Sequence, residues 1–97
     1  MDSINKALQV LSVLKATEEL NKLQLRIVLE LHGRLDEALV HELANVAGVS
    51  APAISRSVDE LEKLGYAKRI RDEKEDRRRV YVRLTNKGNK FIESALA

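Results

Sequence analysis

The side chains with the clearest chemistry in this sequence are cationic, and they gather between residues 68 and 79. Seven Lys or Arg and four Asp or Glu lie there, a balance of +3, and Arg77, Arg78 and Arg79 are consecutive. Guanidinium groups bind phosphate oxygens, and an arginine at a hairpin tip can enter the minor groove of DNA. A solvated tip is the simpler alternative, because charged tips also discourage edge-to-edge pairing of strands.

One carboxylate in this stretch, Asp76, has a candidate role of its own. It can hold an adjacent arginine by a paired hydrogen bond and so fix its direction before DNA arrives. Loss of Asp76 would then weaken binding although the protein becomes more positive. A carboxylate that only balances charge predicts the opposite sign, because its removal takes a repulsive group away from phosphate.

Catalytic and metal-binding chemistry finds little support in the sequence. The only histidines, His32 and His41, fall in separate predicted elements, and no Ser/His/Asp, Cys/His or glycine-rich phosphate-binding spacing occurs. Two histidines with carboxylates could bind zinc across a dimer, but the absence of cysteine makes that signal poor. We therefore predict no enzymatic activity, no metal and no cofactor.

Composition indicates one globular domain spanning residues 1–97. The chain is 44% apolar and 33% charged, has no cysteine, and contains no apolar run near the length of a membrane span. We expect a cytoplasmic protein with no membrane contact. Residues 1–49 carry a charge of −2 and residues 50–97 a charge of +4. A basic half favours a polyanionic partner such as nucleic acid.

The amino-terminal helix, predicted over 2–17, has more apolar surface than one small core needs. At roughly 100° per residue its apolar positions sweep an arc of about 220°, whereas a surface helix needs a stripe of about 100°. A second subunit would cover the excess, so we predict a homodimer built on this helix and the last one. The predicted interface residues are Ile4, Leu8, Leu11, Leu14, Phe91, Ile92 and Leu96.

Local signals predict the elements between these two helices. Asn21 and Gln24 form a capping-box pattern for a helix that ends at Gly33. An extended piece over 38–40 leads to a helix over 41–47, which lacks a good N-cap residue. A turn over 48–50 follows, and Ser50 caps a helix that ends at Leu64.

The remainder of the chain reads as a charged hairpin and a final helix. Strands are predicted over 66–71 and 79–84, and Thr85 can cap the last helix. The fold class is therefore mainly α with a small antiparallel sheet: a winged helix-turn-helix with additional amino- and carboxyl-terminal dimerisation helices. Residues 1–17 and 86–97 would form those helices, and 38–85 the DNA-binding core and wing.

The helix over 50–64 has the shape that entry into a major groove requires. Ile54, Val58 and Leu61 share one face and are predicted to lie in the core. The leading turn carries small residues, and Arg56 is its one long donor. A groove about 12 Å wide admits such a helix, and Arg56 can bind a guanine or a phosphate. An ordinary amphipathic helix with a polar solvent face is the alternative.

The stretch from Val40 to Gly88 resembles the DNA-binding region of the MarR (multiple antibiotic resistance regulator) family. The matching pieces are Glu42–Ala44, Ser50, Ile54-x-x-x-Val58-x-x-Leu61-Glu62, Gly65, Asp76-x-Arg78, and Leu84-Thr85 with Gly88. The resemblance implies a homodimeric transcription regulator, expected to be a repressor, on a pseudo-palindromic operator in double-stranded DNA. Terminal helices shorter than is usual for the family imply a smaller dimer interface.

The resemblance also implies which residues meet DNA. It places Ser50, Pro52, Ala53, Ser55 and Arg56 on the recognition helix, and Arg78 at the wing tip with Asp76 positioning it. A small-molecule effector is left open but is not supported by the sequence. The full predicted DNA-binding set is Ser50, Pro52, Ala53, Ser55, Arg56, Lys74, Asp76, Arg77, Arg78 and Arg79.

Two other functions stay open from the residues alone. An architectural DNA-binding protein of low sequence specificity would share the cationic tip and the salt dependence. A winged-helix module that binds another protein would more often lack both the cationic wing and the slim start of the recognition helix. Competition between a selected DNA and random DNA separates the first alternative from an operator-specific regulator.

Overall fold

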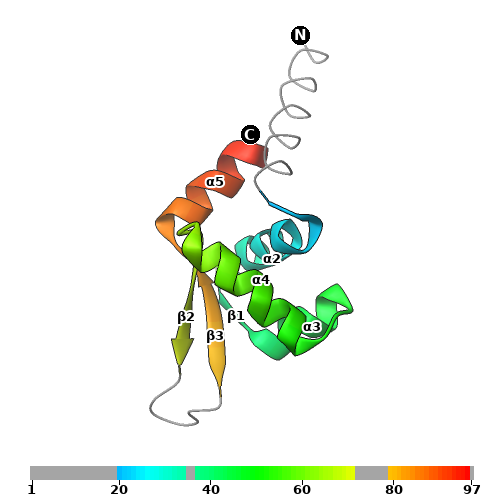
Figure 1. Ribbon diagram of the computed structural model, residues 1–97. Coiled ribbons are helices and arrows are strands. Elements are labelled where there is room, and N and C mark those ends of the chain that lie inside the picture. Colours follow the sequence, from blue (N-terminus) through cyan, green and yellow to red (C-terminus); the bar gives the residue numbers. More distant parts are fainter. Residues whose placement is uncertain (1–19, 35–36, 72–78, 97) are drawn as a thin grey trace.

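The computed structural model describes residues 20–34, 37–71 and 79–96, and the helix predicted over 2–17 lies outside them. Helices cluster at one end of the described part, and the strands β2 and β3 extend away from them (Figure 1). The elements are α2 (Lys22–Gly33), β1 (Glu37–Leu39), α3 (Val40–Ala47), α4 (Ala51–Lys63), β2 (Ala67–Arg71), β3 (Val80–Leu84) and α5 (Asn86–Leu96).

Side-chain caps start three of the helices where the sequence predicts them. The Asn21 side chain accepts from the Gln24 N–H at 2.8 Å, and the Asn21 N–H donates to the Gln24 side chain at 3.0 Å. Ser50 Oγ accepts from the Ala53 N–H at 3.2 Å, and Thr85 Oγ1 from the Gly88 N–H at 3.0 Å. These caps satisfy N–H groups that have no partner inside the helix.

The start of α3 differs by one residue from the prediction, because a residue within the first turn supplies the cap. Leucine at position 39 has no side chain that can accept a hydrogen bond. Glu42 Oε1 accepts from the Leu39 N–H at 3.0 Å instead, so the helix begins at Val40 and the strand before it is Glu37–Leu39. Arg34 at the end of α2 contacts the other Glu42 oxygen at 3.0 Å and Glu30 at 2.8 Å.

These contacts lower the pKa of Glu42. The hydrogen bond from the Leu39 N–H is the largest cause, and the nearby positive charge of Arg34 adds to it, while partial burial acts in the opposite direction. The carboxylate thus ties the end of α2 to the beginning of the helix-turn-helix unit.

A left-handed residue makes the tight turn between α3 and α4. Gly48 has a φ of 68°, a conformation that costs residues with a Cβ atom extra energy, and its N–H donates to the Asn45 carbonyl at 3.3 Å. The turn brings α4 across α3, and α4 ends before Gly65, as predicted.

The three strands form an antiparallel sheet in the order β1-β3-β2. Ala38 pairs with Val82, and on the other side of β3 Arg69 pairs with Val82 and Arg71 with Val80. Both long strands begin one residue later than predicted. Tyr66 is excluded from β2 because its N–H donates to the Leu61 carbonyl and so closes the end of α4.

The core lies between α2, α4, α5 and one face of the sheet. Ile54, Val58 and Leu61 are all fully buried, which confirms the predicted inner face of α4. The element composition and order confirm a mainly helical winged helix-turn-helix.

Helix α5 approaches β2 closely through a glycine. A Cβ atom placed on Gly88 would lie 2.1 Å from the Tyr66 carbonyl oxygen. The Thr85 N–H also donates to that oxygen at 3.0 Å, and Thr85 Oγ1 donates to the Gly65 carbonyl at 2.6 Å. Contacts with the Gly65 and Tyr66 carbonyls therefore hold the start of α5 against the residues that precede β2.

Candidate nucleic-acid interface

Helix α4 presents a slim, exposed leading turn. Ser50, Ala51 and Pro52 are exposed, and Pro52 sits in the first helical turn, where its missing N–H leaves no bond unmade. Arg56, one turn later, is exposed and has no polar partner within the described ranges. Its guanidinium is free to bind an external acceptor such as a base edge or a phosphate.

A groove of about 740 Å³ lies between α4, the start of α3 and the strands β2 and β3. The described residues that line it include no carboxylate; they are Leu39, Val40, His41, Ala51, Ser55, Arg69, Arg71, Arg79 and Val80.

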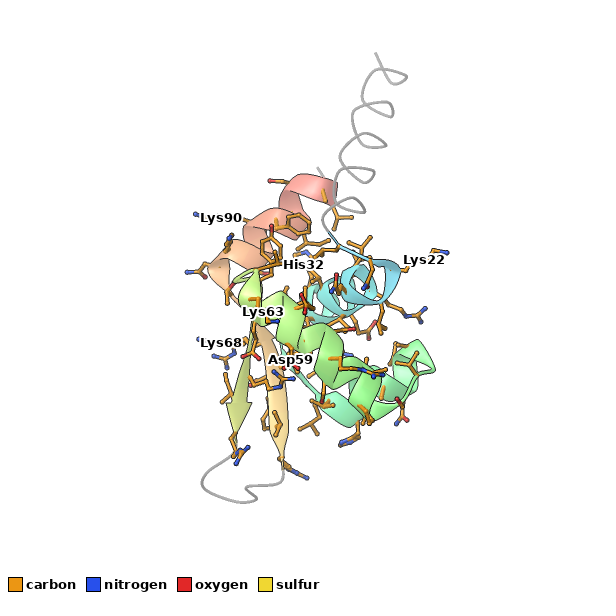
Figure 2. The ribbon with its side chains drawn as sticks, viewed as in Figure 1. Lys22, His32, Asp59, Lys63, Lys68 and Lys90 are labelled. Carbon is orange, nitrogen blue, oxygen red and sulfur yellow. The ribbon has the colours of Figure 1, made fainter. Side chains whose placement is uncertain are left out.

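The arginines reach this groove because of the strand period. Alternate residues of β2 point to opposite faces, so Arg69 and Arg71 share the face turned toward α4. Lys68 is exposed on the outer side of the same strand (Figure 2). Near the helices this face holds the buried pair Ala67 and Leu84, and farther out along the strands Arg69 and Arg71 make it cationic.

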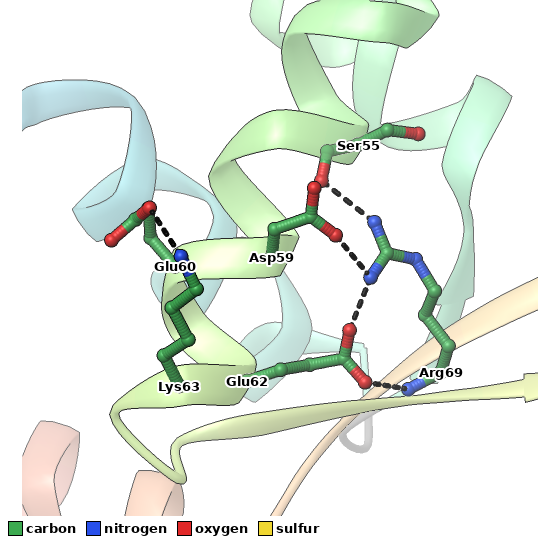
Figure 3. A network of polar contacts seen from close by, with 6 residues as sticks. All are labelled: Ser55, Asp59, Glu60, Glu62, Lys63 and Arg69. Atoms are coloured by element: carbon green, nitrogen blue, oxygen red, sulfur yellow. Dashed lines mark hydrogen bonds and ion pairs between the residues drawn. The ribbon is translucent and has the colours of Figure 1, made fainter.

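Arg69 differs from the other groove arginines because it is fully engaged by α4 (Figure 3). Its Nη2 donates to the Ser55 carbonyl at 2.6 Å, and its Nη1 contacts Asp59 Oδ1 at 2.8 Å and also Glu62 Oε1. The Arg69 N–H donates to the other Glu62 oxygen at 3.4 Å. We call these four residues, Ser55, Asp59, Glu62 and Arg69, the clamp. Within the described ranges, Arg71 and Arg79 have no polar partner.

The structure brings together part of the DNA-binding set predicted from the sequence. Ser55 and Arg79 line the groove, while Ser50, Pro52, Ala53 and Arg56 lie on α4 beside it. The predicted wing residues outside the described ranges are Lys74, Asp76, Arg77 and Arg78.

Sequence reasoning missed three other polar residues that line the groove. Arg69 and Arg71 fall two residues apart on the inner face of β2, and His41 lies at the start of α3. The two-residue spacing of Arg69 and Arg71 predicts that they share one face of β2. It does not predict which face of the strand meets α4, because that depends on a contact between segments distant in the sequence.

Residues of α5 from the predicted dimer interface have distinct surroundings. Phe91 is half-buried and stacks on Tyr66, with ring centroids 4.6 Å apart. Ile92 packs in the subunit's own core, whereas Leu96 is 50% exposed. Ile4, Leu8, Leu11 and Leu14 lie outside the described residues.

The described residues contain no group of three or more His, Cys, Asp or Glu side chains arranged to hold a metal ion. None of the described helices is long and apolar enough to cross a bilayer.

Comparisons with known proteins agree with this geometry. A MepR-like protein solved with pseudoligands is 32% identical, with a TM-score of 0.75 over 96% of this chain and 65% of its own. YusO from Bacillus subtilis is 22% identical, with a TM-score of 0.77 over 98% of this chain and 67% of its own. A mutant MarR from E. coli, solved with operator DNA, is 22% identical, with a TM-score of 0.73 over 97% of this chain and 66% of its own.

This chain thus spans about two thirds of the length of these proteins. No curated protein sequence matches it. The sequence model of the MarR family matches residues 18–79, which include α2, the helix-turn-helix unit and β2. The chain belongs to the MarR family.

Proposed function

We propose that this chain is a transcription regulator that binds a pseudo-palindromic operator in double-stranded DNA as a homodimer and represses the adjacent gene. The observation that carries the proposal is the cationic groove between the exposed start of α4 and the hairpin. A slim helix start enters a major groove, while the arginines beside it, which have no polar partner among the described residues, neutralise the flanking phosphates.

The relatives support the proposal by analogy. The mutant MarR from E. coli was solved with operator DNA, and it shares the fold of this chain. A repressor acts by occupying DNA that polymerase needs, and the exposed start of α4 beside the cationic groove suits such binding.

Dimerisation follows from the sequence of the terminal helices. The helix predicted over 2–17 has an excess apolar arc, and Leu96 on α5 is half exposed. A two-fold axis repeats each contact, so two recognition helices would meet two half-sites of inverted sequence.

Selection of bound duplexes from a random pool tests the function directly. We expect an enriched palindrome whose half-sites lie about one helical turn apart. Recovery of sequences without enrichment would reject operator recognition. The same selection with Arg56→Ala is the matched control, because it removes the one long donor of the leading helix face while leaving the groove arginines in place.

An architectural role is the second candidate, and the groove arginines favour it to some degree. Arg71 and Arg79 can bind phosphates of any sequence. Competition of the selected duplex against random duplex of equal length discriminates the two functions. Equal competition would assign the chain to the architectural class, whereas a large preference for the palindrome would assign it to the regulators.

A further inference from the structure

We propose that Arg69 is a positioning residue that fixes the recognition helix against the wing and thereby sets sequence selectivity, without binding DNA itself. The proposal rests on the proposed function and deepens it. It divides the arginines of one groove into two roles: within the described ranges Arg71 and Arg79 have no polar partner and can bind phosphate, whereas Arg69 is held by α4.

Charge balance is the first argument for this division. The Arg69 guanidinium contacts two carboxylates, Asp59 and Glu62, so the clamp as a whole carries one negative charge. A group so compensated attracts phosphate poorly, although it lines the groove. The charge that faces DNA therefore comes from the neighbouring arginines.

Geometry is the second argument. The planar guanidinium reaches the Ser55 carbonyl with one nitrogen and both carboxylates with the other (Figure 3). Ser55, Asp59 and Glu62 span two turns of α4, so the bonds resist both rotation and sliding of the helix relative to β2. A lysine, with a single point-like ammonium, cannot hold all three acceptors in this way.

The two kinds of DNA contact respond differently when the clamp is lost. Bonds to base edges need the leading turn of α4 in register with the wing, whereas phosphate contacts are tolerant of sequence and of small shifts. Loss of the clamp should thus lower the preference for the selected duplex and leave binding to random duplex nearly unchanged. A residue that bound phosphate would weaken both.

Three variants separate positioning from charge. Arg69→Lys keeps the positive charge and loses the planar guanidinium group. The double variant Glu62→Gln with Arg69→Gln keeps the net charge and removes most of the clamp. Lys68→Gln, on the outer side of the same strand, loses one charge and keeps the clamp. Affinities for the selected duplex and for a random duplex of equal length are measured over a range of salt.

We expect the ratio of the two affinities to fall about three- to tenfold in Arg69→Lys and in the double variant, a range typical of reordering one or two side chains. The slope of log affinity against log salt on random duplex should stay unchanged in both. Lys68→Gln should keep the ratio. An unchanged ratio in Arg69→Lys and the double variant would overturn the proposal, as would a smaller salt slope in the double variant, which has lost the cation at position 69.

A fourth variant keeps the test valid if a substitution at Arg69 unfolds the chain. Asp59 is 57% exposed, so Asp59→Ala should fold while losing the 2.8 Å contact. This variant should bind random duplex slightly more tightly, because a negative charge has been removed. The ratio of its affinity for the selected duplex to that for random duplex should nevertheless be lower than in the unaltered protein. Tighter binding to both duplexes by the same factor would overturn the proposal. If the unaltered protein shows no preference for any duplex, the proposed function itself fails, which the first measurement reveals.

Discussion

Arg56 and Arg69 carry the same charge, but their surroundings assign them different chemistry. Arg56 projects from α4 with no polar partner in the described part of the chain, whereas Arg69 is held by acceptors on three α4 residues. A free guanidinium can form a bidentate pair with a guanine, and one that is already engaged would first have to break its bonds.

Replacement of Arg56 should therefore affect sequence discrimination. If Arg56 forms a bidentate pair with a guanine, Arg56→Ala should cost about 1–3 kcal/mol on the selected duplex and much less on duplexes altered at that base pair. Lys63→Ala, on the same helix and weakly paired with Glu60 at 3.5 Å, is the control and should leave discrimination intact. Equal weakening by Arg56→Ala on every duplex would assign the residue to the DNA backbone.

At the scale of elements, the start of α3 depends on one carboxylate. The pKa of Glu42 is lower when folded, so the group stabilises the fold above its unfolded value of about 4.5 and loses that effect as pH falls through the folded value. Glu42→Gln should accordingly be less stable than the unaltered chain at about pH 7, and the difference should shrink at about pH 3.

Urea unfolding at both pH values measures this difference. Glu93→Gln on α5 is the matched control, since Glu93 is exposed and has no partner in the part of the chain that the structure describes. A difference for Glu42→Gln that is independent of pH would mean that the carboxylate contributes through shape rather than through charge.

The close approach of α5 to β2 gives the second prediction at this scale. Gly88→Ala would push a methyl group against the Tyr66 carbonyl, so we expect a loss of about 3 kcal/mol in unfolding free energy, the upper part of the range for overpacking. Gly33→Ala is the control, because nothing lies within 4 Å of its added Cβ atom. It should be neutral or slightly stabilising. Similar losses in both variants would show that the contact at Gly88 can relax.

The elements differ in how far the sequence predicts them, and locality explains the difference. Asn21, Ser50 and Thr85 were found as caps because each bonds to a residue three positions away. The clamp was missed because Arg69 and Ser55 lie 14 residues apart, and their contact depends on how β2 packs against α4. Val40 was missed as a helix start because Glu42 supplies the cap from inside the helix.

For the whole molecule, phosphate contacts should dominate the salt dependence of binding. Two subunits with two wings and two recognition helices would neutralise about six to ten phosphates, giving a log–log slope of about −5 to −9. Removing Arg71 and Arg79 from the groove, with Arg71→Gln and Arg79→Gln, should reduce the magnitude of that slope by about 3 to 4 in a dimer.

The matched control for this prediction removes two charges elsewhere. Lys22 on α2 and Lys90 on α5 lie at the end of the molecule away from the hairpin (Figure 2). Replacing both with glutamine changes the net charge by the same amount and should leave the slope nearly unchanged. Equal effects of the two pairs would mean that net charge, and not the groove, governs binding.

The contact at Gly88 is also a point about which α5 can rotate as a rigid body. Leu96 lies eight residues beyond Gly88, or about 12 Å along the helix axis, so a rotation of about 10° about the contact moves Leu96 by about 2 Å. The Tyr66 carbonyl, which forms this contact, belongs to a residue three positions before Arg69 in the chain. The half-exposed end of α5 is thus linked through backbone atoms to the base of β2, the strand whose Arg69 contacts α4.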